Sequence, residues 1–258
     1  MTRPVVLSIA GLDPSGGAGI VADIKTIAAL GCFPAAALTS ITFQNTTGVF
    51  GAEHQSAAVL RAQVEPIIHD VKIAAAKTGM LPTAEIVAEV ARLFTEEDLP
   101  APVVDPVVVA TSGDVLIDDK AFEILKTKLF PLARVVTPNI PEAEKLAGFS
   151  ITTDDDMRRA ARAIQLMGPR AVLVKGGHRS FGGQALDILL DENEIFTEFQ
   201  TEYIEVGEVH GSGCTLSAAI AAALGKGLTL EQAIAAAKKY VTDAIRSASR
   251  LGHGSLPL

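Results

Sequence analysis

Short apolar runs that alternate with helix-forming segments constrain the fold of this chain more than any other feature. The runs end in glycine or polar residues and lie at positions 5–10, 34–44, 73–80, 102–109, 134–139 and 171–177. Runs of this length, bounded by turn residues, are typical of buried strands. The segments between them carry apolar residues at helical spacing, such as Ile20, Ile24 and Ile27. The alternation predicts a doubly wound, mostly parallel α/β sheet flanked by helices, with ligands bound beyond the carboxyl ends of its strands.

The later part of the chain departs from this alternation. Residues 184–191 and 195–204 predict a hairpin that turns at Glu192 and Asn193, which gives the sheet a short antiparallel extension. Further helices are expected at 57–69, 84–94, 140–147, 154–166 and 230–249. No linker rich in Pro, Gly or Ser and no internal repeat interrupts the sequence. We therefore expect residues 1–258 to form a single domain.

The composition limits the partners that the chain can have. Lys and Arg total 22 against 30 Asp and Glu, a formal net charge of −8, and the basic residues form no run. This argues against nucleic acid or an anionic membrane as a partner, although backbone N–H groups can still bind a small anion. No apolar window is long enough to span a membrane, and the N-terminus lacks the layout of a signal peptide. With two cysteines and no CxxC pair, neither a disulfide framework nor a zinc site is indicated, so a cytoplasmic protein is expected.

Residues 209–224 are the strongest candidate for a functional segment. Gly211 and Gly213 flank Ser212, and an Ala-rich stretch of high helix propensity follows. A glycine-rich turn that enters a helix leaves backbone N–H groups unpaired at the positive end of the helix dipole, where they can hold an anion such as phosphate. Cys214 lies in the first helical turn, where the same field is expected to lower the pKa of a thiol and make it a proton acceptor. The alternative is a helix packed closely on a strand, with Cys214 as a small buried hydrophobic residue.

Two other segments suit a small ligand. Residues 11–19, which include Asp13, form a glycine-rich turn between a strand and a helix, but they match neither the Walker loop nor the GxGxxG pattern. We expect this loop to bring backbone close to a ligand, with a plain flexible turn as the alternative. The segment that ends at Gln44 and Asn45 offers amide donors and acceptors suited to a heteroaromatic ring, whereas turn chemistry would explain the same residues.

Acidic residues mark a further region. Asp105 lies inside an apolar run, where a carboxylate is costly unless it meets a cation or hydrogen-bond donors. Asn139 and Glu142 are three residues apart across a helix start, so their oxygens could bind Mg²⁺ directly or through its waters. A capping box at that helix start is an equally good interpretation of the spacing. The loops that follow these strands are expected to converge on residues 211–214.

Seven motifs, in order along the chain, together resemble one family. They are SIAGLDPSGGAGIVADIKT, FQNTTGV, AAKTGM, VVDPVVVATSGD, TPNIPEAE, VLVKGGH and HGSGCTLSAAIAA. Over essentially its whole length the chain resembles the hydroxymethylpyrimidine/phosphomethylpyrimidine kinases of thiamin biosynthesis, which belong to the ribokinase-like superfamily. The resemblance implies ATP-dependent phosphorylation of 4-amino-5-hydroxymethyl-2-methylpyrimidine and then of its monophosphate. It also implies a mostly parallel sheet between helices and a homodimer.

The matching positions imply roles for individual residues. Gln44 matches the pyrimidine-binding glutamine of the family, and Cys214 matches its catalytic base. The other positions implied for substrate binding are Gly11, Asp13, Met80 and Val107. The positions implied for the anion hole are Gly211, Ser212 and Gly213. Those implied for ATP, with Mg²⁺ organised by the NxxE pair, are Asp105, Asn139, Glu142, Lys175 and Gly177. The family usually has Thr where this chain has Ser212 and often Ala where it has Phe43, which borders the pyrimidine site.

Other functions stay open at this point. A pyridoxal kinase of the same subgroup also phosphorylates a hydroxymethyl group on a six-membered heteroaromatic ring with a Cys-type base. A non-catalytic ligand-binding module is the alternative from another class. The intact glycine-rich turn at residues 211–213, the thiol of Cys214 and the NxxE pair argue against it. An NAD-dependent dehydrogenase is excluded by the lack of GxGxxG.

Overall fold

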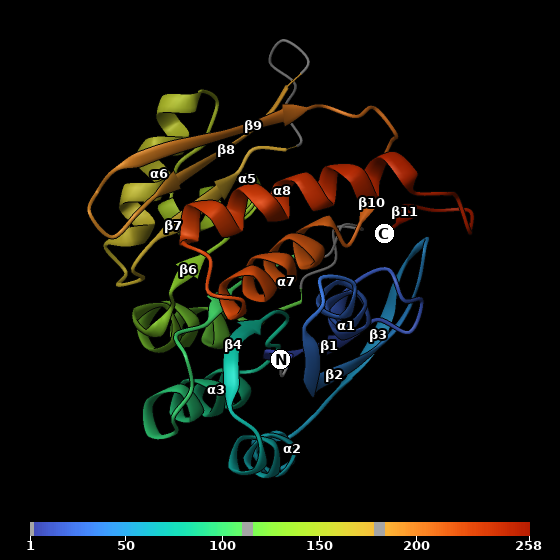
Figure 1. Ribbon diagram of the computed structural model, residues 1–258, viewed down its shortest axis with the longest axis vertical. Helices are drawn as coiled ribbons and strands as arrows, with labels where there is room; N and C mark the ends of the chain where they lie inside the picture. The colour runs from blue at the N-terminus through green and yellow to red at the C-terminus, as the bar shows by residue number, and fades with distance from the viewer. Residues whose placement is uncertain (1–2, 110–115, 178–183) are drawn as a thin grey trace.

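One large sheet organises the chain in a computed structural model that describes residues 3–109, 116–177 and 184–258 (Figure 1). Within these residues nine strands pair in the order β3-β2-β1-β4-β5-β6-β7-β8-β9. The parallel strands are β1 (Val5–Leu12), β2 (Phe33–Asn45), β4 (Ile73–Thr78), β5 (Val103–Val104), β6 (Val135–Val136) and β7 (Val172–Lys175). The antiparallel strands are β3 (Gly48–His54) at one edge and β8 (Gln184–Leu190) and β9 (Phe196–Glu202) at the other. The expected mostly parallel sheet and the late hairpin are confirmed. Residues 110–114 of one motif and His178 of another lie outside the described residues.

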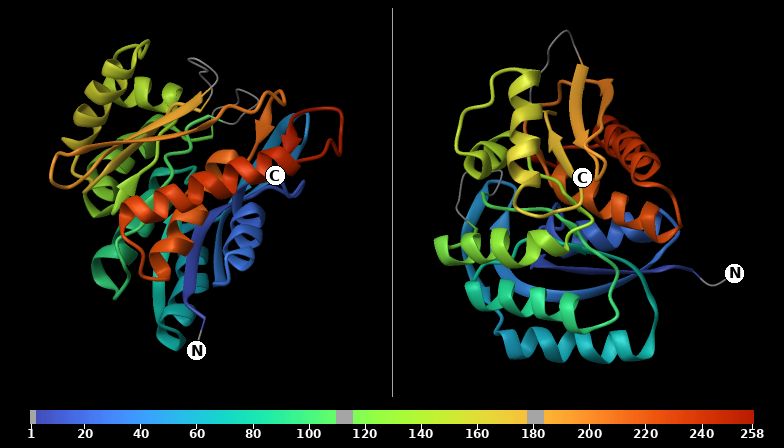
Figure 2. Two further views of the ribbon diagram at one scale, coloured as in Figure 1. Left: turned by 45° about the horizontal axis from the view of Figure 1, so that its top comes forward. Right: turned by 90° about the vertical axis from the view of Figure 1, so that its left-hand side faces the viewer.

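Helices cover both faces of the sheet (Figure 2). One face carries α1 (Gly19–Ala29), α7 (Ser212–Gly225) and α8 (Leu230–Ser247). The other carries α2 (Ala57–Asp70), α3 (Ala84–Glu96), α4 (Asp119–Ile124), α5 (Ile140–Ala147) and α6 (Asp154–Gln165), with short helical turns at Leu125–Leu129 and Phe130–Leu132. The neighbouring β1 residues Val6 and Leu7 belong to opposite apolar cores, because successive side chains of a strand point to opposite faces. Burial on both faces explains why these strands read as nearly continuous apolar runs.

The direction of winding reverses at β1. The chain passes from β1 through α1 to β2 on one side, and β4 later pairs with the other side of β1. At such a reversal the loops beyond the carboxyl ends of the strands separate and leave room for a ligand. The loops after β1 and β4 therefore border the place where a ligand is expected.

Some strands differ from the prediction. The run at 102–109 forms only the short strand β5, because the chain turns at Asp105, whose carbonyl accepts the Val107 N–H, and Pro106 has no N–H to donate. Asp105 thus lies just beyond a strand rather than inside one. The strands β3, β10 (Val209–His210) and β11 (Leu256–Pro257) were not predicted, because their short sequences lack a clear alternating pattern.

The C-terminal segment ties two parts of the fold together. Its strand β11 pairs with β10, directly before α7. The Ser255 N–H donates to the carbonyl of Thr46 at 2.8 Å. A Cβ on Gly254 would lie 1.8 Å from that same carbonyl oxygen, so only glycine fits. The segment therefore holds the turn between β2 and β3 close to the start of α7 (Figure 1).

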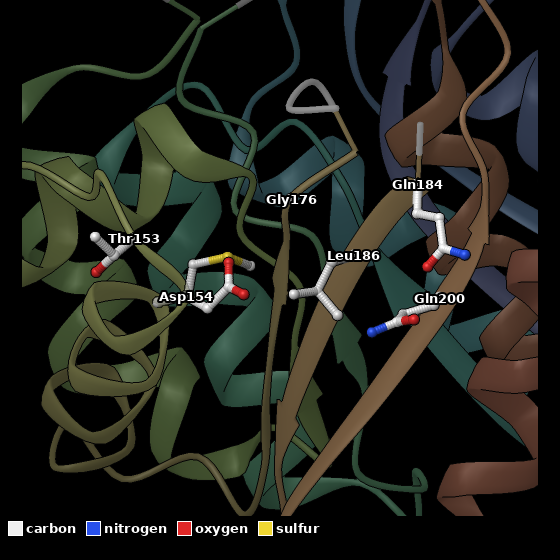
Figure 3. A pocket seen from close by; sticks show the side chains of 7 residues that line it. Thr153, Asp154, Gly176, Gln184, Leu186 and Gln200 are labelled. Atoms are coloured by element: carbon white, nitrogen blue, oxygen red, sulfur yellow. The ribbon is translucent and has the colours of Figure 1, made fainter. Parts of the chain in front are cut away.

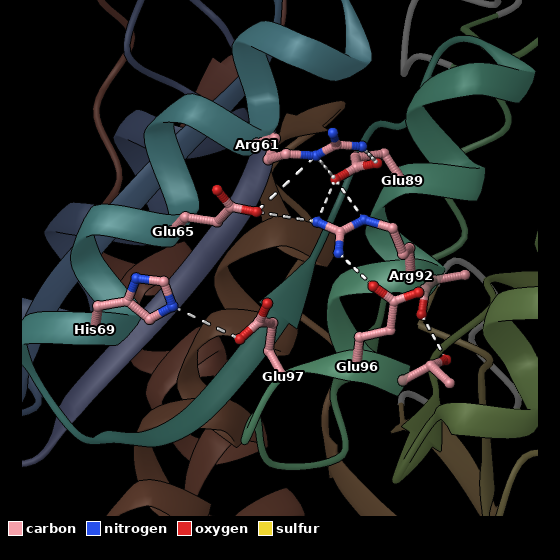
Figure 4. A network of polar contacts seen from close by, with 9 residues as sticks. Arg61, Glu65, His69, Glu89, Arg92, Glu96 and Glu97 are labelled. Atoms are coloured by element: carbon pink, nitrogen blue, oxygen red, sulfur yellow. Dashed lines mark hydrogen bonds and ion pairs between the residues drawn. The ribbon is translucent and has the colours of Figure 1, made fainter.

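A network of charged side chains joins α2 to α3 (Figure 4). Glu89 lies at its centre and accepts hydrogen bonds from Nη2 of Arg61 at 2.7 Å and from Nη2 of Arg92 at 2.8 Å. These bonds lower the pKa of Glu89 to about 2 although burial opposes the shift, and the bond from Arg61 makes the largest contribution. The network fastens two helices of one layer and supplies no group to the site described below. Across the described ranges, none of the helices combines the length and apolarity that a membrane crossing requires.

Candidate functional site

The start of α7 has the geometry that the sequence predicts for an anion-binding site, and residues 211–214 are called the cradle below. Gly211 is the N-cap residue in a left-handed conformation, with φ 85°, and no described side chain caps the helix. The N–H groups of the first helical turn therefore point past the helix end without a capping side chain, at the positive end of the helix dipole. Ser212, Gly213 and Cys214 are all partly exposed at this end. The geometry suits a phosphate-sized anion.

Backbone from another loop closes one side of the cradle. A Cβ on Gly211 would lie 1.8 Å from the carbonyl oxygen of Gly17, so the loop at 11–19 touches the N-cap directly. A Cβ on Gly213 would lie 3.1 Å from Nζ of Lys175, which places that ammonium at the cradle. The glycine-rich loop thus comes close to the helix start itself, and its approach to a ligand stays a prediction.

Gly211→Ala is expected to lower kcat by about 10²–10³-fold, because the new methyl group has to displace either Gly17 or the N–H groups of the cradle. Gly227 supplies the matched control, since it has a similar φ of 87° but open space where a Cβ would lie. Gly227→Ala carries the same backbone strain and should leave kcat close to the wild-type value. Steady-state rates of both purified variants test this, and equal losses in the two would assign the effect to strain alone.

A largely buried ion pair faces the cradle from the neighbouring strand ends. Nζ of Lys175 donates to Oδ1 of Asp105 at 2.9 Å, and Thr137 Oγ1 donates to the same oxygen at 3.0 Å. Burial would raise the pKa of Asp105, but Lys175 and Lys77 together hold it below its usual value. Burial would lower the pKa of Lys175, but Asp105 raises it. Both groups therefore stay charged. The free-energy cost of burying the Asp105 carboxylate, which the sequence predicts, is offset by the Lys175 ammonium and the Thr137 hydroxyl.

Asn139 and Glu142 form the capping box of α5. Asn139 Oδ1 accepts the Glu142 N–H at 2.9 Å, and Glu142 Oε2 accepts the Asn139 N–H at 2.8 Å. The structural alternative for this pair is therefore confirmed. Glu142 is nonetheless unusual, because burial raises its pKa to about 7, with Lys175 opposing and Asp105 reinforcing the shift. A carboxyl group that titrates near neutrality beside the cradle can respond to a cation or a proton.

Cys214 lies at the cradle but does not have the expected pKa. It is half-buried and belongs to neither apolar core. The prediction of a lowered pKa is wrong: burial raises the pKa of the thiol to about 11, and the charges of Asp23 and Asp105 add to the shift. Lys77 and the Gly19 N–H, which donates to the sulfur, act in the opposite direction and do not compensate. Burial is the largest cause and sets the direction of the shift.

A second buried ion pair lies close to Cys214 and was missed in the sequence. Nζ of Lys77 donates to both carboxylate oxygens of Asp23, at 3.0 and 2.8 Å, and both side chains have 0% exposure. Ser8 adds a hydrogen bond to Asp23 at 2.5 Å. Asp23 and Asp105 raise the pKa of Lys77 well above its usual range although burial opposes them. A lysine in the apolar strand AAAKTG could have signalled this pair, because an isolated ammonium cannot be buried.

Two of the residues predicted to bind substrate, Gln44 and Asp13, meet at the residue that precedes the cradle. The Gln44 amide lies 3.1 Å from Nε2 of His210, the residue before Gly211, and that nitrogen is 2.9 Å from Oδ2 of Asp13. Asp13 also accepts the Ala18 N–H at 2.9 Å, so its carboxylate holds the glycine-rich loop folded. Sequence reasoning singled out Gln44 and Asp13 but not His210.

The remaining predicted residues lie around this arrangement. Gly11 packs on Met80, since a Cβ on Gly11 would lie 3.0 Å from Sδ of Met80. Val107 is partly exposed and follows Asp105 in the turn after β5. Gly177 is partly exposed, with open space where a side chain would be, and follows Gly176 after the end of β7. The strand-end loops therefore converge as predicted.

A separate pocket lies beside the end of β7, on the side of α6 (Figure 3). It is lined by Thr153, Asp154, Met157, Gly176, Gln184, Leu186 and Gln200. The close-up shows the two glutamines on β8 and β9 and the polar pair at the start of α6 on opposite sides of the hollow. None of these residues belongs to the predicted site, and the pocket shares only the end of β7 with it.

A glycine-rich helix start at the reversal point of a doubly wound sheet, faced by a Lys–Asp pair and a strand-end glutamine, is the arrangement expected of a ribokinase-like small-molecule kinase. Residues 13–258 match the phosphomethylpyrimidine kinase family, and the chain belongs to that family.

Individual relatives agree with this assignment. The hydroxymethylpyrimidine/phosphomethylpyrimidine kinase of Streptomyces coelicolor is 44% identical over 258 residues, which cover 100% of this chain and 94% of that protein. The ADP complex of Bacillus subtilis pyridoxal kinase superposes with a TM-score of 0.90 at 36% identity, over 99% of this chain and 96% of that one. The phosphomethylpyrimidine kinase of Clostridium difficile 630 superposes with a TM-score of 0.82 at 40% identity, over 94% of this chain and 100% of that one.

Proposed function

We propose that this chain is an ATP-dependent kinase that phosphorylates 4-amino-5-hydroxymethyl-2-methylpyrimidine and then its monophosphate in thiamin biosynthesis, with residues 1–258 acting as one kinase domain. The observation that carries the proposal is the 3.1 Å contact between Gln44 and His210, because His210 directly precedes the cradle. A ring held by Gln44 would present a short substituent to the N–H groups at residues 211–214. The names of the curated relatives support the pyrimidine as substrate, and the ADP complex of a structural neighbour supports ATP as the phosphoryl donor.

In the proposed reaction the alcohol oxygen forms a bond to the γ-phosphorus of ATP while the bond to the β–γ bridging oxygen breaks and ADP leaves. The N–H groups of the cradle and Lys175 would stabilise the charge on the transferring phosphoryl oxygens, which is the main contribution in loose transition states. The sulfur of Cys214 would take the hydroxyl proton. In the second phosphorylation the attacking group is a phosphate oxygen, which near pH 8 has already lost its proton. Cys214 would therefore matter mainly for the first step.

We propose that Asn139 and Glu142 hold Mg²⁺ through its waters. No group of three or more His, Cys, Asp or Glu side chains in the described part of the chain is arranged to hold a metal. Mg²⁺ usually keeps several waters and binds through one or two carboxylates together with substrate phosphates, and the buried Glu142 beside Asp105 suits that mode. When bound there, the ion would neutralise charge on the nucleotide phosphates.

The Mg²⁺ requirement is expected to depend on pH through Glu142. Its pKa of about 7 means that the carboxylate is mostly protonated at pH 6 and mostly ionised at pH 8. Since a cation binds the ionised form, the Mg²⁺ concentration for half-maximal activity should fall by about tenfold over this range. Glu142→Gln keeps the capping box but never ionises, so it should need more Mg²⁺ at pH 8 and lose this dependence. The protonation of ATP is the same for both proteins at a given pH, so comparing their Mg²⁺ titrations removes its contribution. Identical Mg²⁺ titration curves for the two proteins would show that Glu142 does not hold Mg²⁺.

A coupled assay of ADP formation tests the function. We expect turnover with the hydroxymethylpyrimidine and with its monophosphate, at a kcat/KM at least tenfold above that for pyridoxal. Higher kcat/KM for pyridoxal would instead make the chain a pyridoxal kinase, the alternative that the pyridoxal kinase neighbours favour. No ADP with any of the three acceptors would point to a binding module.

We also propose a cytoplasmic homodimer without nucleic-acid or membrane partners. The net charge of −8 and the free thiols of Cys32 and Cys214 fit this setting. Phe43 and Phe50 are 53% and 70% exposed on β2 and on β3, the edge strand of the sheet, which suits burial against a second copy.

Phe50→Ser is expected to shift the protein from twice the chain mass of 26.9 kDa toward the single chain in light scattering. Leu166→Ser, at a position that is 90% exposed next to α6, should leave the mass unchanged and serves as the control. A wild-type protein whose mass in light scattering equals that of one chain would contradict the homodimer.

A further inference from the structure

The side-chain amide of Gln44 takes part in contacts that cannot all form as placed. Its Nε2 lies 3.1 Å from Nε2 of His210, and that same ring nitrogen lies 2.9 Å from Oδ2 of Asp13. Burial would raise the pKa of Asp13, but hydrogen bonds from His210 and Ser15 lower it, so the carboxylate is ionised and can only accept. The His210 nitrogen therefore carries a hydrogen and donates it to Asp13. A ring nitrogen that carries hydrogen has no lone pair for the NH₂ group of an amide.

The opposite end of the amide has the same difficulty. Oγ1 of Thr42 lies 2.9 Å from the carbonyl oxygen of Leu12, to which it donates its only hydrogen. The amide atom of Gln44 that lies 3.1 Å from Oγ1 must then be a donor. A half-turn of the amide plane exchanges Oε1 and Nε2. Nε2 can then donate to Thr42 Oγ1, and Oε1 faces the N–H of His210, which Asp13 and Gln44 share as a three-centre hydrogen bond.

We propose that His210, itself oriented by Asp13, is a positioning residue that fixes the Gln44 amide with Oε1 toward the cradle and Nε2 toward Thr42. Its consequence for specificity rests on the proposed function. One lone pair of Oε1 and one N–H of Nε2 remain free side by side. They match a ring edge that carries an exocyclic N–H next to a ring nitrogen, as an aminopyrimidine does. A pyridine ring without an amino substituent matches only one of the two.

The amide orientation also decides which way the ring points. Oε1 is the amide atom nearer to His210, and His210 precedes Gly211, so the exocyclic amino group pairs on the cradle side. The hydroxymethyl group of the pyrimidine is on the carbon next to the one that carries this amino group, so it lies toward residues 211–214. A reversed amide would require the ring to turn over, which carries the hydroxymethyl group away from the cradle.

The His210 ring is itself held tightly. A Cβ on Gly17 would lie 2.6 Å from Cδ2 of the ring and 3.0 Å from Cβ of Pro257, so the glycine-rich loop and β11 both pack against this position. His210 as a whole residue is buried, at 8% exposure. Its donor nitrogen therefore has a fixed place, which is what a positioning group requires.

Kinetics of two variants test the effect on specificity. His210→Leu removes the donor, and His210→Gln keeps an N–H at a similar reach. We expect His210→Leu to lower the ratio of kcat/KM for the hydroxymethylpyrimidine to that for pyridoxal by at least tenfold, mainly through KM for the pyrimidine. His210→Gln should restore most of that ratio. A proportional loss for both acceptors, or no rescue by glutamine, would overturn the proposal and leave His210 a purely structural role.

A measurement on the enzyme without substrate separates this proposal from the proposed function. In ¹H–¹⁵N NMR spectra of the wild-type protein, the NH₂ hydrogens of Gln44 should show nuclear Overhauser contacts to the methyl group of Thr42 and none to the His210 ring. Gln44→Leu identifies the signals. Contacts to the His210 ring would overturn the assigned orientation, whatever the enzyme phosphorylates. The expected contacts together with no kinase activity would leave the orientation standing and reject the proposed function alone.

Discussion

Cys214→Ala is expected to lower kcat for the hydroxymethylpyrimidine by about 10²–10⁴-fold with little change in KM, since a proton acceptor acts mainly in the transition state. The thiol is half-buried at the mouth of the cradle, and the Gly19 N–H donates to its sulfur. Steady-state kinetics of the purified variant measure this. A kcat within about tenfold of the wild-type value would remove Cys214 from the role of base.

The pH dependence follows from the raised pKa of this thiol. With a pKa of about 11, only about one molecule in 10⁴ carries the thiolate at pH 7. The ionised fraction grows tenfold with each pH unit, so kcat should rise throughout pH 7 to 10 without a plateau. In Cys214→Ala this rise should disappear. A flat profile in the wild-type enzyme would mean that the neutral thiol only accepts a hydrogen bond from the alcohol.

Two controls isolate the proton transfer. The monophosphate of the pyrimidine attacks through an oxygen that carries no proton near pH 8, so its phosphorylation should be affected far less by Cys214→Ala. Cys32→Ala removes the other thiol, which is buried beside Ala222 rather than at the cradle, and should keep the rise with pH. Equal losses for both acceptors would indicate that Cys214→Ala disturbs the cradle rather than the proton transfer.

The sequence predicts those parts of the molecule that depend on local patterns. The apolar runs identify the parallel strands, and Gly211 with Gly213 identifies the cradle, because a glycine-rich helix start has the same geometry wherever it occurs. The position of Asn139 and Glu142 was also predicted, but spacing alone could not distinguish a cap from a metal site. The structure shows that the cap is present.

What the sequence could not predict depends on contacts between distant segments. The contact of Gln44 with His210 joins residues that are 166 positions apart, and the Lys77 pair with Asp23 joins residues 54 positions apart. The pKa of Cys214 was wrongly predicted for the same reason. The helix start argued for a lowered pKa, whereas burial raises it, and burial depends on how α7 packs against elements from elsewhere in the chain, such as α1 and β4.

Lys77→Met is expected to destabilise the protein by about 3–5 kcal/mol, because it leaves the carboxylate of Asp23 buried without its cation. Both side chains have 0% exposure, so solvent cannot replace the lost partner. Urea unfolding followed by circular dichroism measures the change. The double variant Lys77→Met with Asp23→Leu removes both charges and should recover most of the loss, since apolar pairs of similar volume replace buried ion pairs at little cost. A double variant as unstable as Lys77→Met would show that the loss comes from packing.

The same double variant separates stability from catalysis. Lys77 is the main charge that lowers the pKa of Cys214 against the effect of burial. Without it the pKa of the thiol should rise further, and each unit of that rise removes about tenfold of the thiolate at a fixed pH. The double variant should therefore be stable but slow, with its rise of kcat displaced to higher pH. Losing Asp23 as well removes a charge that raises the pKa of the thiol, so the displacement should be smaller than in Lys77→Met alone. If the double variant recovered both kcat and stability in full, the pair of Lys77 and Asp23 would have a structural role only. The loss of the Lys77 ammonium would then have no effect on the thiol of Cys214.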